Sequence, residues 1–363
     1  MLTAAKAWLA ELRSGADPRR FAYCEREDPA EMRGQLLLAL QYDHSPGDAP
    51  LLRLLLDAER EAHARSEYQG LEEGLDLAAW LVATLRDPAD VFRLWAAKCA
   101  NFDTQCGFDG EYLVAAGVAR TVAYLRASED PRSAAILAYL ADDSGDCRFS
   151  EAEIEDWRAA KAEWFPARET DEMPRTMLER ALAFAPEQAP HWLAVWLAGE
   201  ERGDRTLVDL CHYALQIEDF ERAIAVAREL VDRAGDGDEV VGAHERLAGV
   251  LITAGRLVDA AAALTEAATR AATRSRSAWE QRCLLERWLE LAEAAHDDLG
   301  RRAFARADAL FTAGFGHCHD NLRRLAACAA ALGETEAATR LAAARDLEGR
   351  RLDEQMLRLQ SPA

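Results

Sequence analysis

The chain has 363 residues, of which 64 are acidic and 43 basic, so its formal net charge is −21. Such a charge repels the phosphates of nucleic acid, so we expect no nucleic-acid partner and favour a basic protein. No apolar run approaches the length of a membrane span, and the first helix lacks the pattern of a secretory signal, so we expect no membrane segment.

The acidity is uneven along the chain. Residues 271–363 contain 14 arginines and 14 acidic residues, so the whole excess of negative charge lies in residues 1–270. A partner that recognises charge should therefore bind that part of the chain.

Residue usage indicates where the protein works. The eight cysteines are scattered without any CxxC pair, which favours free thiols in a reducing cytoplasm. Only three lysines occur against many arginines and alanines, which we interpret as GC-rich coding, typical of many bacteria.

Apolar residues recur at helical spacing almost everywhere, as in 51–68, 71–87 and 110–128. The breaks between these segments are short, which makes neighbouring helices pack as antiparallel pairs. We therefore predict an all-α fold of antiparallel helix pairs stacked as an α-solenoid. Residues 1–166 form an acidic helical domain, either degenerate repeats or a bundle, and 164–174, with two prolines, marks its boundary.

Two segments of this first domain carry polar side chains that could have a function. Residues 57–67, DAEREAHARSE, place Glu59 and His63 on one helix face, and we interpret them as a solvated surface. Residues 98–113 form a polar and aromatic segment between helices, where repeat proteins often bind their partners. The candidate protein-binding residues are Phe102, Asp103, Phe108, Asp109 and Tyr112. The alternative is a joint between helices, with Phe102 and Phe108 in the core.

Residues 141–153, ADDSGDCRFSEAE, nearly match a calcium loop. Asp142, Ser144, Asp146, Ser150 and Glu153 have the ligand spacing, although a cysteine stands where the sharp turn needs glycine. A simpler interpretation is a helix start, in which Ser150 and Glu153 form a capping box and Asp142 and Asp146 are turn residues. The candidate metal ligands are Asp142, Ser144, Asp146 and Glu153.

The second half of the chain, residues 175–363, contains three segments that share one pattern: 207–230, 244–267 and 322–345. Each has a leucine and a small residue in its first helix and, twelve residues after the small one, an alanine that opens the second helix. The turn between them holds glycine in the last two segments and glutamate in the first. The shared residues are Cys211, Ala248 and Ala326 in the first helix, Glu218, Gly255 and Gly333 in the turn, and Ala223, Ala260 and Ala338 in the second helix.

This pattern resembles the tetratricopeptide repeat over roughly residues 205–346, with 284–311 as a divergent unit. The resemblance implies a right-handed superhelix whose concave face binds peptides or protein segments. It implies no particular ligand.

No sequence motif of catalysis or cofactor binding is present, and we expect no cofactor. In residues 314–321, GFGHCHDN, His317, Cys318 and His319 could bind zinc, but the ligand set is incomplete. The alternative is a loop in which Asp320 or Asn321 caps the start of the next helix.

Three hypotheses for the function follow. The first is a non-catalytic, protein-binding scaffold or adaptor. The second is an acidic inhibitor or immunity-type protein that neutralises a basic toxin or nuclease. The third is an enzyme with a metal-dependent site between helices. Self-association is compatible with each of them.

Overall fold

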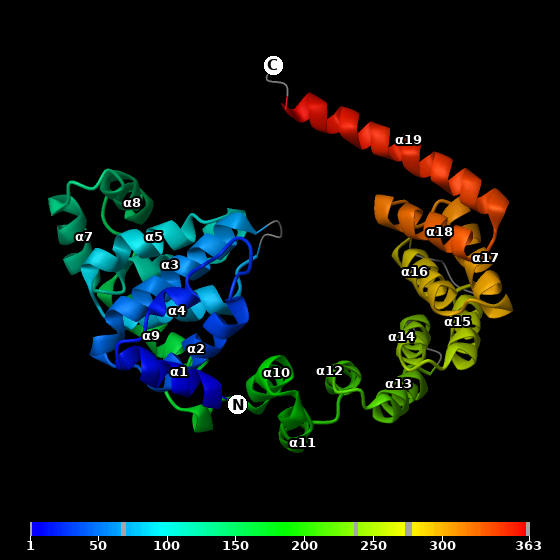
Figure 1. Ribbon diagram of the computed structural model, residues 1–363, viewed down its shortest axis with the longest axis horizontal. Helices are drawn as coiled ribbons and strands as arrows, with labels where there is room; N and C mark the ends of the chain where they lie inside the picture. The colour runs from blue at the N-terminus through cyan, green and yellow to red at the C-terminus, as the bar shows by residue number, and fades with distance from the viewer. Residues whose placement is uncertain (1, 67–69, 236–238, 273–277, 361–363) are drawn as a thin grey trace. The chain divides into compact units, whose positions relative to one another are not determined.

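The computed structural model describes residues 2–66, 70–235, 239–272 and 278–360, with side chains up to residue 351. These residues form α-helices and short 3-10 helices without any strand, and the only β-type pairing among them is a single bridge between Ala141 and Cys147 (Figure 1). The prediction of an all-α fold is confirmed, and helices that follow one another along the chain pack in adjacent pairs. The chain divides into two compact units, Met1–Gln188 and Ala189–Ala363.

The first unit is built from ten α-helices among its described residues. They are α1 (Thr3–Arg13), α2 (Ala30–Tyr42), α3 (Ala49–Arg65), α4 (Glu73–Thr84), α5 (Val91–Lys98), α6 (Phe102–Gly107), α7 (Val118–Ala127), α8 (Ser133–Leu140), α9 (Glu151–Trp164) and α10 (Pro174–Phe184). The short 3-10 helices between them are η1 (Pro18–Phe21), η2 (Pro46–Asp48), η3 (Pro88–Asp90), η4 (Gly110–Val114), η5 (Glu169–Asp171) and η6 (Pro186–Gln188).

Helices α2 and α4 run through the core of this unit. Helix α2 buries the five consecutive residues from Leu36 to Leu40, which is typical of a helix enclosed on most sides. Aromatic side chains pack around this core, and the Trp157 ring meets those of Trp80 and Tyr112 edge-on, with centroids 6.0 and 4.9 Å away. Such edge-to-face pairs stabilise a core beyond the area they bury.

The proline-containing segment 164–174 lies inside the first unit. Glu172 accepts hydrogen bonds from Tyr42 (2.6 Å) and Gln41 (2.8 Å) of α2, and it pairs with Arg180 of α10 at 2.5 Å. The Glu172 carboxylate is almost fully buried. These polar contacts hold α10 against α2, and the division between the units follows Gln188.

The second unit consists of helices joined by short turns. They are α11 (Ala189–Gly199), α12 (Asp204–Gln216), α13 (Phe220–Ala234), α14 (Val240–Thr253), α15 (Leu257–Ala272), α16 (Ala278–Ala294), α17 (Asp298–Thr312), α18 (His319–Ala331) and α19 (Thr335–Gln360). The most extensive contacts are those within the pairs α12–α13, α14–α15, α16–α17 and α18–α19.

The turns of three of these pairs share one backbone conformation. Glu218, Gly255 and Gly333 all have positive φ values, of 59°, 72° and 75°. Glycine adopts this left-handed conformation without penalty, whereas a side chain costs roughly 1 kcal/mol. Glu218 therefore occupies the same position as the two glycines, at the expense of local strain.

Among the described residues, four ion pairs join successive helix pairs, and all four run in one direction. In each case the arginine belongs to the later helix pair and the carboxylate to the earlier one. The contacts are Arg256–Glu221 (4.0 Å), Arg287–Glu245 (3.5 Å), Arg324–Glu293 (2.7 Å) and Arg340–Asp308 (2.6 Å).

Candidate functional site

A groove of about 500 Å³ crosses the first helices of three successive pairs in the second unit, α12, α14 and α16. Its side chains recur at the three- and four-residue spacing that places them on one face of each helix. The opposite faces are buried. The groove residues used below are Val208, His212 and Leu215 from α12, Gly242, Glu245, Arg246 and Gly249 from α14, and Trp279, Glu286, Arg287 and Glu290 from α16.

Arg287 crosses the floor of this groove. Its guanidinium donates a hydrogen bond to Glu290 (2.6 Å) and lies 3.5 Å from Glu245 on the neighbouring helix. Gly249 makes room for it, because a Cβ there would come within 3.2 Å of the Arg287 Cζ atom. Burial alone lowers the Arg287 pKa, but the two carboxylates outweigh it and leave the pKa above its usual value. Burial also raises the pKa of Glu245, against the opposing effect of Arg287.

Other groups in the groove remain available for a ligand. Arg246 has no hydrogen bond or ion pair with any part of the chain that the structure describes, whereas Glu286 pairs with Arg282. Trp279 is 70% exposed although it is a large aromatic residue. The groove thus combines a free cation and an indole with the apolar side chains of α12, which suits a polypeptide segment better than a reaction centre.

The protein-binding residues predicted from the sequence fall into two groups in the structure. Phe102 is 65% exposed on the short helix α6, where Asp103 follows it, half-buried. Phe108 and Tyr112 are buried at 1% and 0% exposure, and their rings pack together with centroids 4.8 Å apart. The structure therefore places Phe108 and Tyr112 in the core of the first unit and leaves Phe102 on its surface.

Asp109 belongs to the buried group through its polar contacts. It accepts a hydrogen bond from the Trp157 indole (2.9 Å) and lies 3.1 Å from the Lys161 ammonium. Lys161 also forms an ion pair with Asp76, and Asp76 accepts a hydrogen bond from the Tyr112 hydroxyl at 2.7 Å. Burial first, and then the Asp76 charge, raise the Tyr112 pKa well above its usual value. These groups satisfy one another's hydrogen bonds and charges, so we interpret the cluster as a structural contact that holds η4 against α9.

The residues proposed for calcium form a turn and a helix cap. The Asp142 carboxylate accepts hydrogen bonds from the Ser144 amide and hydroxyl (2.8 and 2.6 Å) and from the Asp146 amide (3.1 Å). Ser150 and Glu153 form the expected capping box at the start of α9, each side chain accepting from the other's backbone amide. The capping interpretation is confirmed, and these bonds occupy carboxylate oxygens that a metal would need.

The histidine-rich turn before α18 also has a structural role. His317 stacks on Phe311 with ring centroids 4.4 Å apart and bonds the Phe311 carbonyl at 2.9 Å. The cap of α18 is Cys318 and not Asp320 or Asn321 as expected, since the Cys318 sulfur accepts a hydrogen bond from the Asn321 amide at 3.4 Å. Within the described residues, no group of three or more histidine, cysteine or acidic side chains is placed to hold a metal ion.

One buried polar cluster in the first unit was not predicted from the sequence. Glu59 and His63 are each only 6% exposed, so the interpretation of 57–67 as a solvated face is wrong for both. Arg33, 1% exposed, donates from Nε to Glu59 (2.7 Å) and from both terminal nitrogens to Asp28 (2.8 and 3.0 Å). Burial lowers the Arg33 pKa, but these carboxylates reverse the shift and raise it. Helical spacing could not reveal this, because Arg33 comes from another helix.

The neighbourhood of this cluster is a polar cavity of about 430 Å³. The His63 ring contacts the Glu59 carbonyl through Nδ1 (2.8 Å) and accepts a hydrogen bond from the Glu72 amide at Nε2 (3.2 Å). With both ring nitrogens engaged, His63 offers neither a proton acceptor nor a metal ligand, and the groove remains the better candidate.

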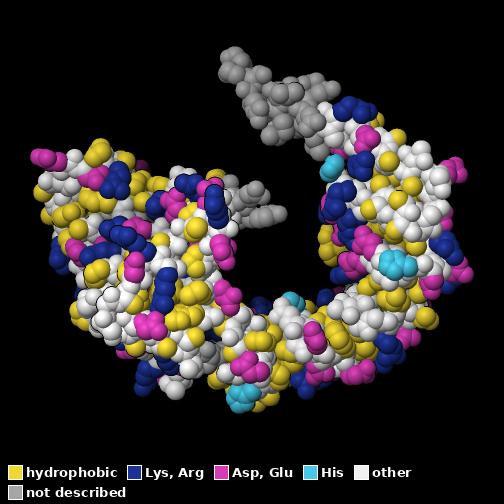
Figure 2. All heavy atoms as spheres, in the orientation of Figure 1, with side chains coloured by type: hydrophobic (Ala, Val, Ile, Leu, Met, Phe, Trp, Pro, Cys, Tyr) yellow, Lys and Arg dark blue, Asp and Glu magenta, His cyan; other side chains and the backbone are white. Residues whose placement is uncertain are grey.

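None of the helices traced in the described residues is both long and apolar enough to cross a membrane. On the face drawn in Figure 2, acidic and basic side chains are interspersed over both units. Comparison with protein-family models, with curated proteins and with solved structures finds no match for this chain.

Proposed function

We propose that the chain is a non-catalytic, protein-binding scaffold whose second unit is a tetratricopeptide-like array. The left-handed backbone conformation shared by Glu218, Gly255 and Gly333 supports this, because it gives three helix pairs the same turn between their two helices. The small residues expected at the helix crossings also support it, since Cys211 and Ala248 are buried where the paired helices meet.

The single observation that carries the proposal is the groove across α12, α14 and α16. It is continuous over three successive first helices, and Arg246 is its one cation without a hydrogen bond or ion pair in the described chain. An extended segment would lie along Val208 and Leu215 with its apolar side chains and meet Arg246 with a carboxylate or a backbone carbonyl. Because the floor is already organised by Arg287, binding would need little rearrangement.

The partner as a whole is proposed to be a basic cytoplasmic protein. The excess of 21 negative charges over residues 1–270 would attract it over long range, while the groove would hold a local segment. Affinity for such a partner should fall as salt rises, since exposed charges are screened within about 10 Å at 0.1 M salt.

The test is a peptide-display selection on the full chain. Peptides that still bind the Val208→Arg variant, whose groove should be blocked, are removed by counter-selection. The matched control is Val258→Arg, which places the same side chain on the exposed side of α15. Selected peptides should bind the wild type and the Val258→Arg variant alike. Their affinity should fall about tenfold or more in Arg246→Gln, the cost of losing a hydrogen bond to a charged group, and remain unchanged in Arg228→Gln on α13.

Two results would refute the proposal. One is a selection that enriches no peptide with saturable, single-site binding to the wild type. The other is a set of peptides that bind Val208→Arg and Arg246→Gln as tightly as the wild type, which would place their site outside the groove.

A further inference from the structure

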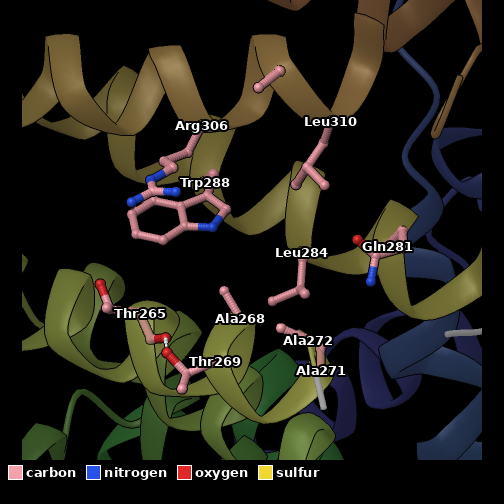
Figure 3. Close-up of a pocket in the computed structure, with 11 residues that line it drawn as sticks. Thr265, Ala268, Thr269, Ala271, Ala272, Gln281, Leu284, Trp288, Arg306 and Leu310 are labelled. Carbon is pink, nitrogen blue, oxygen red and sulfur yellow. Dashed lines mark hydrogen bonds between the residues drawn. The ribbon is translucent and has the colours of Figure 1, made fainter. Parts of the chain in front are cut away.

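A second cavity in the same unit is separate from the groove and lies between α15, α16 and α17 (Figure 3). Its volume of about 440 Å³ is in the range of sites for small organic ligands, roughly 300–1,000 Å³. The α15 wall is formed largely by Ala268, Ala271 and Ala272, whose short side chains leave the space open. Leu284 from α16 and Leu310 from α17 complete an apolar lining.

One hydrogen-bond donor that lines this cavity has no acceptor among the described residues. Trp288 is only 6% exposed, yet its indole N–H bonds no residue that the structure describes. In Figure 3 the indole projects from α16 with its nitrogen on the side that faces the middle of the cavity. The indole nitrogen is not one of the fully buried polar atoms that lack a partner in the described chain, so its N–H is open to an acceptor that enters the cavity.

A free cation adjoins the same cavity. Arg306 from α17 lines it and has no ion pair with any described carboxylate. Arg306 is exposed, as is Arg302 one turn earlier, which also has no ion pair with a described carboxylate but does not line the cavity. Figure 3 shows Arg306 and Trp288 projecting toward α15 from their two helices. Two donors without a partner in the described chain, one of them charged, therefore line the same largely apolar cavity.

The polar groups on the α15 side do not satisfy these donors. Thr265 and Thr269 donate their hydroxyl protons to backbone carbonyls one turn earlier, at 2.7 and 2.8 Å. Neither threonine carries a charge, so the cavity has a net positive charge from Arg306 alone. The complementary ligand is an anion with at least two acceptor atoms and an apolar body.

We propose that this cavity binds a small organic carboxylate with an apolar body. The carboxylate accepts from the Arg306 guanidinium and the Trp288 indole, which stabilises it by charge-assisted hydrogen bonds. The body lies over the alanines of α15 and against Leu284 and Leu310, where it removes apolar surface from water. This site is independent of the proposed function of the groove.

The test uses the fluorescent aromatic sulfonate 1-anilinonaphthalene-8-sulfonate, whose anion stands in for the carboxylate, and its neutral analogue N-phenyl-1-naphthylamine. The full chain should bind the sulfonate at one saturable site and the neutral analogue more weakly. Arg306→Gln should weaken sulfonate binding by roughly ten- to a hundred-fold, the range for a lost hydrogen bond to a charged group. Arg302→Gln, an exposed position on the same helix, should leave it unchanged.

A second pair of variants tests the apolar part of the site. Ala268→Phe should fill the cavity and abolish binding, whereas Ala262→Phe, at an exposed position of the same helix, should not. Displacement of the probe by 2-naphthoate or by decanoate would distinguish an aromatic body from an aliphatic one. Equal affinity for the neutral analogue, binding that survives Arg306→Gln or Ala268→Phe, or displacement by neither acid would each overturn the proposal.

Discussion

Replacing Gly300 by alanine should destabilise the second unit, although alanine is the better helix former. Gly300 is the third residue of α17, and a Cβ there would lie 1.7 Å from the carbonyl oxygen of Ala295, just after α16. Real Cβ contacts do not fall below 3.0 Å, so two stretches of backbone must separate by at least 1.3 Å. No flexible side chain can absorb that shift.

The size of the effect follows from two opposing contributions. Helix propensity favours alanine by about 1 kcal/mol, and overpacking against backbone costs about 3 kcal/mol. The net loss of about 2 kcal/mol should lower the melting temperature of a unit of this size by about 4–8 °C. Gly242→Ala is the matched control, since it is also helical and nothing lies within 4 Å of its Cβ, so it should gain up to about 1 kcal/mol.

Thermal unfolding followed by far-UV circular dichroism gives the shift, and hydrogen exchange of peptides from α16 and α17 assigns it to the second unit. Exchange in these two helices should accelerate in Gly300→Ala, while exchange in the first unit stays unchanged. If Gly300→Ala melts at or above the wild-type temperature, the turn between α16 and α17 has room that the structure does not show, and the reasoning fails.

Three further outcomes are expected. Glu59→Ala leaves the buried guanidinium of Arg33 with one carboxylate instead of two, so the free energy of unfolding in urea should fall by about 3 kcal/mol. Asp171→Ala breaks an exposed ion pair and should lower it by less than about 0.5 kcal/mol, so equal losses would contradict the prediction. Burial raises the pKa of Cys328 from 9.0 to about 11, so the stability that its neutral thiol contributes is complete below pH 9 and is lost as the pH rises toward 11. Wild type should therefore lose more stability over this pH range than Cys328→Ala, and equal losses in unfolding curves would contradict the prediction. Millimolar calcium should leave the melting temperature unchanged, and a rise that Asp142→Ala abolishes would restore the metal site.

The sequence was most informative where the physics is local. Helical spacing predicted the all-α fold, and the capping box of Ser150 and Glu153 is visible because both partners lie within one turn. The repeat alignment placed Glu218 opposite two turn glycines, and its positive φ agrees with that alignment although the residue type does not.

The sequence was least informative where partners come from different helices. The charge of Glu59 suggested solvent, but Arg33, 26 residues earlier, neutralises it in the core. Phe108 and Tyr112 are candidates alongside Phe102 in the sequence, and only the packing of Phe108 on Tyr112, and of Tyr112 on Trp157 of α9, separates them. The groove and the cavity beside Trp288 could not be predicted, because each depends on which faces of three different helices meet.

The one-way ion pairs between successive helix pairs have a consequence for how this chain can change in evolution. In the part of the chain that the structure describes, each of these four contacts joins an arginine of the later pair to a carboxylate of the earlier pair, as in Arg287–Glu245 and Arg324–Glu293. Duplication or loss of a whole pair therefore leaves an arginine of one pair facing the pair before it. Inserting a few residues within a helix would instead rotate its arginine and its carboxylate away from their partners in the neighbouring pairs. Homologous chains should differ in length by whole helix pairs.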